Sequence, residues 1–445
     1  MPNISIREQE ETIYRAFDAT ENTVLIPLLY ARTYTKTKAE GAEEETVTYL
    51  ESDDIKGILF SSVNEFKTTL SGHYVYTDEA TIDRSYTMAY ELLLAGLNVV
   101  IKPITFDNAD KKYHGDDGTA VNTYIDEEAY FDILEKAINE NGAYEEFRDR
   151  NIFNIKFITS GAYMNKGAVT NDENSAIVAI DKTMVEIAED RGDAIALVEL
   201  RPTFETKSEL ISELKEMTVG EEYMYSACFF PWCTFTTSAG GVTTTTKMPA
   251  CFAYLKAYAN SVKSNANWFA ASGVTRGQIP DMVAPAFDVG ESLMHILQGD
   301  VAYDNTNFLQ LRVNPIYNAG SYGYRIWGNR TTWASSTATK LRYQEFLNVR
   351  ILVCDIKKQT FHAAMRTTFE PNDDIVWINF KGLVNTLLEQ MVSGRGLMFY
   401  RWTKQKADDK ATIKATLTIR PIEAVESFDI NVILTEDETT LTESV

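Results

Sequence analysis

Histidine and cysteine are scarce in this chain, and their scarcity limits the chemistry that it can perform. The 445 residues contain 4 cysteines and 4 histidines. Cys228 and Cys233 lie five positions apart, whereas Cys251 and Cys354 have no nearby partner in the sequence. A structural zinc site needs about four cysteine or histidine ligands in paired spacing, and this sequence contains no such pattern. We therefore expect no metal site, and we expect reduced, buried thiols of a protein from a reducing cytoplasm.

Long apolar runs and an excess of positive charge are also missing. No window approaches the ~18 apolar residues of a membrane-spanning helix, and the first residues lack the basic and apolar segments of a secretory signal. Asp and Glu number 64 against 42 Lys and Arg, which gives a net charge of −22. Nucleic-acid backbones and anionic lipid surfaces repel so acidic a chain. We expect neither a nucleic-acid partner nor membrane insertion.

Short catalytic and cofactor-binding motifs are absent from the sequence. No Gly-x-Gly-x-x-Gly follows a predicted strand, and no Gly-x-Ser-x-Gly occurs. Residues 240–248 (GGVTTTTKM) come nearest to a phosphate loop. They lack the glycine before Lys247 and the hydroxyl residue after it, so we interpret them as a threonine-rich surface loop. The sequence therefore predicts no enzyme and no cofactor.

Strands and helices alternate in the middle of the chain. The predicted strands cover residues 152–159, 194–200 and 223–229. The predicted helices between them cover residues 174–190 and 208–217. Upstream, a helix is expected at residues 84–97 between strands at 23–34 and 98–104, and a short helix before residue 70 is expected to be capped by Ser61 or Ser62. This alternation predicts a parallel α/β sheet.

The carboxy-terminal third has a different pattern. Residues 345–355 predict a strand, and the strict alternation of residues 411–419 predicts another. Between them, we expect a helix over residues 374–392, because its apolar residues recur every three or four positions. Its expected boundaries are a cap at Asn372 or Asp373 and terminating glycines at Gly394 and Gly396.

Several short motifs follow one another in a characteristic order. The most specific is GYRIWGNRT, which contains Gly323, Trp327, Gly328, Arg330 and Thr331. The others are Trp268 with Gly273 and Arg276, Asn314, Phe346 with Asn348 and Arg350, the turn Phe369-Glu370-Pro371-Asn372 with Trp377, and Pro421 with Phe428 and Ile430. This ordered series resembles the contractile tail sheath family of bacteriophages, pyocins and related injection machines, over nearly the whole chain.

The resemblance implies a multi-domain chain of the α/β and α+β classes. A parallel-rich α/β middle domain is expected beside a mixed α+β inner domain, with extended strands at both termini. The expected divisions are an N-terminal arm at residues 1–22, an α/β outer domain at 23–290, an inner sheath domain at 291–425 and a C-terminal arm at 426–445. The alternative for residues 23–105 is that they pack with the inner domain.

The resemblance also implies a structural role rather than an enzymatic one. Members of the family stack as six-fold rings around a tail tube and contract to drive the tube into a cell. The implied partners are further copies of the chain, the tail tube protein, and the baseplate and tail terminator proteins. The implied location is a virion tail assembled in the bacterial host cytoplasm. Two alternatives stay open: an α/β enzyme without a recognisable motif, and a non-contractile virion component.

Both chain ends have the pattern of strands that join neighbouring copies. Near the carboxy terminus, the apolar residues Phe428, Ile430, Val432 and Leu434 share one face of a predicted strand. Ile4 and Ile6 supply a shorter strand at the other end. Such strands can add to an exposed sheet edge of another subunit. The alternative is that the last strand completes the sheet of its own domain.

The predicted helix at residues 374–392 is a candidate tube-facing element by resemblance. Its apolar face is expected to pack into the core. The polar positions Lys381, Asn385 and Glu389 are therefore the candidates for contact with the tube. An ordinary core-packed amphipathic helix is the alternative.

Overall fold

We describe the protein from a computed structural model. The structure describes residues 18–31, 33–36, 45–48, 56–70, 84–106, 133–162, 176–200, 204, 206–210, 224–241, 243–298, 312–333, 343–406 and 411–425. The predicted arm residues Ile4, Ile6, Phe428, Ile430, Val432 and Leu434 lie outside these ranges. Their role stays a prediction.

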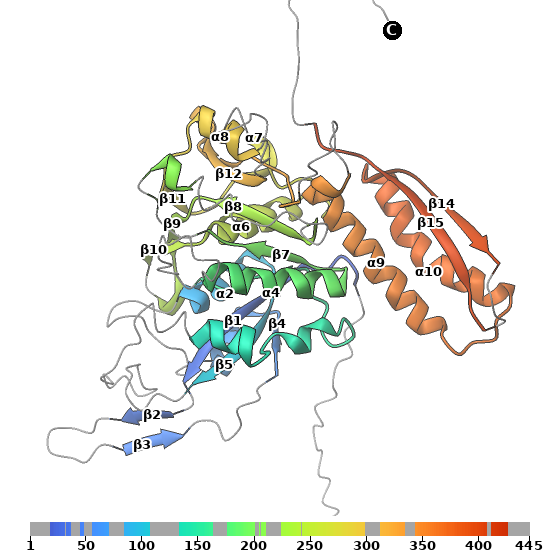
Figure 1. Cartoon of the computed structure of the whole chain (residues 1–445), viewed down its shortest axis with the longest axis horizontal. Coiled ribbons are helices and arrows are strands. Elements are labelled where there is room, and N and C mark those ends of the chain that lie inside the picture. The colour runs from blue at the N-terminus through green and yellow to red at the C-terminus, as the bar shows by residue number, and fades with distance from the viewer. Residues whose placement is uncertain are drawn as a thin grey trace, which may run out of the picture.

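An eight-stranded sheet forms the body of the protein (Figure 1), in the order β13-β12-β8-β7-β6-β1-β5-β4. Its strands are β1 (Thr23–Ala31), β4 (Ile58–Phe60), β5 (Asn98–Phe106), β6 (Phe157–Ile158), β7 (Ile195–Val198), β8 (Ser226–Phe230), β12 (Val313–Asn318) and β13 (Tyr324–Ile326). The strands from β12 to β5 run parallel, and β13 and β4 pair antiparallel at the two edges. The prediction of a parallel α/β sheet is confirmed.

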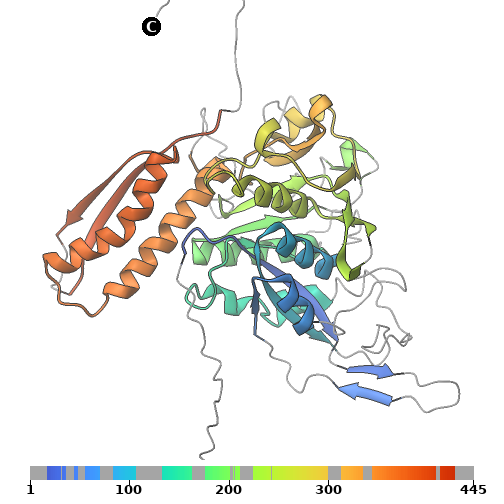
Figure 2. The same cartoon turned by 180° about the vertical axis from the view of Figure 1, so that it is seen from behind.

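Helices cover both faces of this sheet. The helices are α1 (Val63–Leu70), α2 (Arg84–Ala95), α4 (Ala176–Arg191), α6 (Ala250–Val262), α7 (Gly273–Arg276), α8 (Glu291–Gln298), α9 (Leu347–Thr367) and α10 (Asp374–Ser393). Figures 1 and 2, seen from opposite sides, show α4 on one face and α2 with α6 on the other. The predicted cap of α1 is confirmed at Ser62, whose hydroxyl oxygen accepts a hydrogen bond from the Asn64 amide at 3.2 Å.

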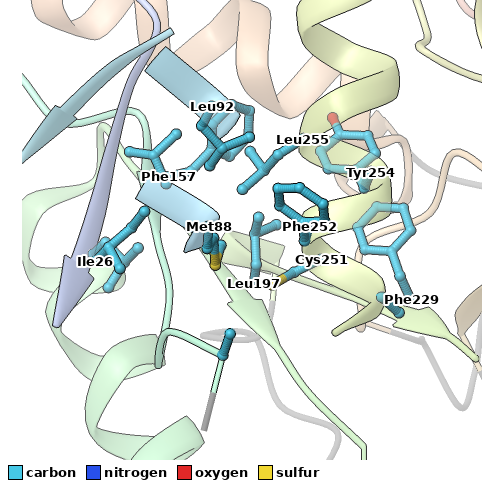
Figure 3. Packing of buried hydrophobic residues seen from close by; sticks show 14 of the residues in the cluster. Ile26, Met88, Leu92, Phe157, Leu197, Phe229, Cys251, Phe252, Tyr254 and Leu255 are labelled. Carbon is cyan, nitrogen blue, oxygen red and sulfur yellow. The ribbon is translucent and has the colours of Figure 1, made fainter. Parts of the chain in front are cut away.

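The main core lies between the sheet and the helix pair α2 and α6 (Figure 3). Met88 and Leu92 of α2 pack there beside Phe252 and Tyr254 of α6. Tyr254 stacks on Phe229 of β8, with the ring centroids 4.2 Å apart. These side chains are almost completely buried, and each contributes on the order of 1.5–3 kcal/mol of transfer free energy.

The predicted strand at residues 152–159 is shorter in the structure than in the prediction. The ladder begins at Lys156, whose amide donates to the Thr23 carbonyl and whose carbonyl accepts from the Ile195 amide. Before it, backbone carbonyls bond to side chains. The carbonyl of Phe153 accepts a hydrogen bond from Arg191, and that of Ile155 accepts one from Lys358.

The threonine-rich segment forms a strand and not the surface loop that we expected. A second sheet has the order β10-β9-β11. Its strands are β9 (Cys233–Thr237), β10 (Thr244–Met248) and β11 (Met282–Pro285). The Thr237 hydroxyl bonds to those of Thr244 and Thr246 across the β9–β10 pair. Threonine is β-branched and favours a strand once a partner strand is present.

The prediction of a strand at residues 345–355 is wrong, because these residues begin the long helix α9. Leu347, Ile351 and Cys354 are buried in the main core. Leu352 and Ile356, on another side of the helix, are buried in a second core. A helix that is buried on two sides lacks a clean 3.6-residue period, and its Val and Ile residues then resemble a strand.

The second core holds together a unit of two helices and a hairpin, which we call the helix–hairpin unit. It consists of α9, α10, β14 (Leu397–Gln405) and β15 (Lys414–Pro421). Figures 1 and 2 show this unit projecting from one side of the body. Asp373 caps α10 as predicted, since its carboxylate accepts hydrogen bonds from Ile375 and Val376. The predicted helix at residues 374–392 and the alternating strand before Pro421 are confirmed.

The part of the chain that forms the large sheet does not end at residue 290. β12 and β13 follow that position and still belong to the large sheet. The second core begins at α9 and also includes Ala19, which precedes β1. The remaining described elements are β2 (Thr33–Lys36), β3 (Glu45–Thr48), and short turns at Lys136–Glu140, Glu145–Arg148, Ala239–Gly241, Gly320–Tyr322 and Tyr343–Glu345.

One buried carboxyl group in the main core carries a testable pH dependence. Glu199 follows β7, and its Oε1 accepts a hydrogen bond of 2.9 Å from the Cys251 amide in the first turn of α6. Burial raises the pKa of Glu199 from 4.5 to about 8. The folded protein therefore holds this proton more tightly than the unfolded chain, and the free energy of unfolding falls as the pH rises from about 4.5 to about 8.

We predict that Glu199→Gln removes this part of the pH dependence. Above pH 8 the variant should be more stable than the unmodified protein by on the order of 2–4 kcal/mol, and near pH 4.5 the two should be similar. Urea unfolding at several pH values measures this difference. Glu186→Gln, at an exposed position of α4, is the control. Parallel stability curves for Glu199→Gln and the unmodified protein would contradict the prediction.

Candidate assembly interface

Helix α9 attaches the helix–hairpin unit to the amino-terminal edge of the parallel strands. Lys156 immediately precedes β6, and its ammonium group pairs with the Asp355 carboxylate of α9 at 2.9 Å. Both side chains are at most 1% exposed. Tyr225 immediately precedes β8, and its hydroxyl oxygen accepts a hydrogen bond of 2.6 Å from Lys357 of α9. These contacts fix α9 across successive strand ends.

The charges at this attachment are buried, and burial shifts the pKa values of Asp355 and Lys358. It raises the pKa of Asp355, while the nearby ammonium groups of Lys156 and Lys358 oppose the rise. It also lowers the pKa of Lys358 to about 8. Arg191 is completely buried beside them and pairs with Asp193 at 2.9 Å. Removing one partner of such a pair leaves an uncompensated buried charge, which costs about 3–5 kcal/mol.

An aromatic cluster joins α10 to the hairpin. The rings of Trp377 and Phe380 stack with centroids 5.8 Å apart, and Trp402 of β14 meets both edge-on at 5.7 Å. The indole N–H of Trp402 donates a hydrogen bond of 2.9 Å to the Asn385 side chain. The hairpin is thereby held against one side of α10.

The three candidate tube-facing residues form a row on the side of α10 next to β14. The Lys381 ammonium group lies 5.3 Å from the centre of the Trp377 ring. Asn385 accepts the hydrogen bond from Trp402, and Glu389 accepts one of 3.4 Å from the Tyr400 hydroxyl. Glu389 is exposed, whereas Lys381 and Asn385 are half-buried. The row is therefore partly covered by the hairpin.

A second row on α10 is open to solvent and was missed in the sequence. Ile375 is 66% exposed and Ile378 is 61% exposed. Gly382 and Thr386 continue the row and are also exposed. The signal was present in the spacing, because Ile375 and Ile378 do not share the period of the buried set.

The hairpin presents unpaired sheet edges. Among the described residues, β14 and β15 form a sheet of only two strands. One face packs on the helices through Trp402, Leu417 and Ile419. The opposite face is exposed and includes Arg401 and Thr418. Each strand thus has one edge whose backbone groups can pair with a further strand.

The tip of the helix–hairpin unit contains an apolar cavity of about 350 Å³. Trp377, Phe380 and Trp402 line it on one side. Phe369, in the turn between α9 and α10, also lines it and is completely exposed with a φ of 70°. Exposed aromatic groups beside a concave apolar surface are typical of protein contacts.

The large sheet does not present catalytic geometry in the part of the chain that the structure describes. A polar cavity of about 370 Å³ is lined by Lys256, Glu91 and Asp281. Their charges pair with one another, Lys256 lying 2.9 Å from Asp281 and 3.4 Å from Glu91. Ser85 of α2 lies close to Gly161, and its hydroxyl oxygen accepts a hydrogen bond of 2.8 Å from the Ala162 amide.

The cysteines, the possible metal-binding groups and the helices of the described residues also bear on function. The four cysteines are buried and free. Among the residues that the structure describes, no group of three or more His, Cys, Asp and Glu side chains is placed to hold a metal ion. Over the same residues, no helix has the length and apolar character needed to cross a membrane.

Comparisons with known proteins identify solved structures with a similar fold. No family model matches the sequence, and no curated protein matches it. The sheath complex of the extracellular contractile injection system PVC, in the contracted state, matches with a TM-score of 0.60 and 13% identity over 98% of both chains. A chain of the contracted anti-feeding prophage (AFP) baseplate matches with a TM-score of 0.58 and 15% identity over 99% of both chains.

A chain of the six-fold symmetrised AFP baseplate is also similar, with a TM-score of 0.55 and 12% identity over 98% of this chain and 99% of that one. The matches extend over the large sheet and the helix–hairpin unit together, because they cover nearly the whole of each chain. The chain therefore has the fold of contractile injection system sheath proteins, as the sequence motifs suggested.

Proposed function

We propose that this chain is the structural subunit of a contractile sheath. In this proposal, copies stack as six-fold rings around a tail tube, and contraction of the stack drives the tube through the envelope of a target cell. The partners are further copies of the chain, the tube protein, the baseplate and the tail terminator. The particle is a phage tail or a phage-like injection system assembled in the bacterial cytoplasm.

The whole-chain likeness to the PVC sheath is the observation that carries this proposal. It extends to the projecting helix–hairpin unit, which an α/β enzyme does not need. Fold alone does not establish function. The hairpin supplies an independent reason, because among the described residues each of its two strands has one edge without a partner strand.

The terminal arms supply strands for these edges in our proposal. A strand of about seven residues spans roughly 23 Å. Burying its four apolar side chains would contribute on the order of 6–12 kcal/mol before the costs of ordering. A link of that strength holds neighbouring copies together while the subunits turn as rigid bodies. The extended sheath would then persist because its rearrangement is slow.

We predict that deleting residues 427–445 leaves a folded, unassembled protein. The last described element, β15, ends at Pro421, and every described residue of the two cores precedes residue 427. The loss of the strand should abolish tube-shaped assemblies in negative-stain electron microscopy, while the circular dichroism spectrum and melting temperature stay close to those of the full chain. Sheaths formed by the deletion variant would contradict the proposed arm.

Substitutions within the arm make this test more specific. Ile430→Asp with Val432→Asp places charges on the predicted inner face, whereas Asp429→Asn with Asn431→Asp changes the opposite face with no change in net charge. Only the first pair should prevent assembly. Equal assembly by both pairs would show that the alternation of the arm has no role.

Helix α10 is the tube-facing element in our proposal. Lys381, Asn385 and Glu389 remain candidates for the contact, although the hairpin covers part of their row. The row that begins with Ile375 and Ile378 is more exposed. Its small residues, Gly382 and Thr386, allow another backbone to approach closely.

We predict that Ile378→Glu weakens binding to the tube by about tenfold or more, because the charge must be desolvated at the contact. Lys381→Glu should have a smaller effect, since its side chain already lies over Trp377. Co-sedimentation with purified tubes measures both. Unchanged binding of Ile378→Glu would remove the exposed row from the contact, and unchanged binding of both variants would remove α10.

A further inference from the structure

The segment just before β1 lies in the joint between the large sheet and the helix–hairpin unit. Ala19 is 3% exposed and belongs to the second core, with residues of α9 and α10. The carbonyl of Thr20 accepts hydrogen bonds from the Asn267 side chain at 2.6 Å and from Lys156 at 3.1 Å. Asn22 accepts a hydrogen bond of 2.9 Å from the Tyr258 hydroxyl. Residues 18–22 are thus held by both parts of the molecule.

Trp268, the next residue after Asn267, contacts the helix–hairpin unit. Its ring lies against the turn between α10 and β14. A Cβ atom added at Gly394 or Gly396 would lie 2.6 or 2.7 Å from the ring. The indole N–H donates a hydrogen bond of 2.9 Å to the Gly394 carbonyl. These two glycines are needed because no side chain fits between the turn and the indole.

The same turn also holds the point where β15 ends. The Ile422 amide donates a hydrogen bond of 3.0 Å to the Gly396 carbonyl. The chain continues from there toward residue 426. Trp268 also contacts α9, since its carbonyl accepts a hydrogen bond of 3.0 Å from the Asn348 side chain in the first turn of that helix.

We infer that Asn267 and Trp268 act as one positioning element for the two ends of the chain. Because they are adjacent in sequence, one peptide unit links the residues that precede β1 to the residues that follow β15. Asn267 positions residues 18–22, and Trp268 positions α9 and the α10–β14 turn. The direction of the helix–hairpin unit and the origins of both terminal segments are therefore set together.

This inference rests on the proposed function only where it treats the terminal segments as arms. The coupling itself is a property of the single folded chain. It can be tested in solution without any assembled sheath, so a failure of one proposal does not imply a failure of the other.

Gly396→Ala is the most direct test. The three atoms nearest to the added methyl group all belong to the Trp268 ring. The methyl group should therefore displace Trp268 and, through it, the adjacent Asn267. Gly290→Ala is the matched control, because nothing lies within 4 Å of its added Cβ atom and it lies outside the helix–hairpin unit. Hydrogen exchange of the full-length protein, read by mass spectrometry, reports both ends of the joint.

The expected result is exchange about tenfold faster in peptides covering residues 18–22 and 420–424, with β1 and β5 unchanged. Trp268→Ala in the same chain should remove the effect of Gly396→Ala, so that the double variant exchanges like Trp268→Ala alone. Gly290→Ala should exchange like the unmodified protein.

Two outcomes would overturn the inference. The first is faster exchange near residue 396 with residues 18–22 unaffected, which would make Trp268 a local packing residue only. The second is a double variant in which the effects of Gly396→Ala and Trp268→Ala on hydrogen exchange simply add. If Gly396→Ala fails to fold, Asn267→Ala serves instead, since it removes the bond to Thr20 without adding volume. It should then speed exchange in residues 420–424 as well, and an effect confined to residues 18–22 would equally contradict the coupling.

Discussion

The attachment of α9 across the amino-terminal edge of the parallel strands is the constraint on which the rest of the structure depends. The Lys156–Asp355 ion pair is almost completely buried, and such a pair tolerates little displacement because separation leaves two charges without solvent. It holds the third turn of α9 against the sheet, and α9 packs against α10 in the helix–hairpin unit. Nearby contacts of Asn267 and Trp268 bring both chain ends to the same joint.

Under the proposed function, this arrangement would let one chain serve a lattice that changes its packing. The large sheet and the helix–hairpin unit have separate cores, so each keeps its own fold. The two-stranded sheet that β14 and β15 form among the described residues lies on the projecting unit. Connections made there between copies would be of the heterologous kind, which generate rings and helical tubes when repeated.

The sequence was sufficient for the parallel sheet, the α10 cap at Asp373 and the hairpin strand before Pro421, because local spacing determines each of them. It was insufficient for α9, where two cores bury opposite sides and erase the helical period, and for β10, whose threonines needed a partner strand. The partial cover of Lys381 and Asn385 depends on Trp377 and Trp402, which only tertiary structure brings beside them. The joint at Trp268 depends on residues more than a hundred positions apart.

The most direct measurement of the central claim is an electron cryo-microscopy map of particles assembled from the full-length chain. Our account predicts rings of copies in which residues 427–434 of one copy extend the β14–β15 sheet of another, with density continuous across the boundary. A map of an assembled particle in which both termini fold wholly onto their own molecule would contradict it.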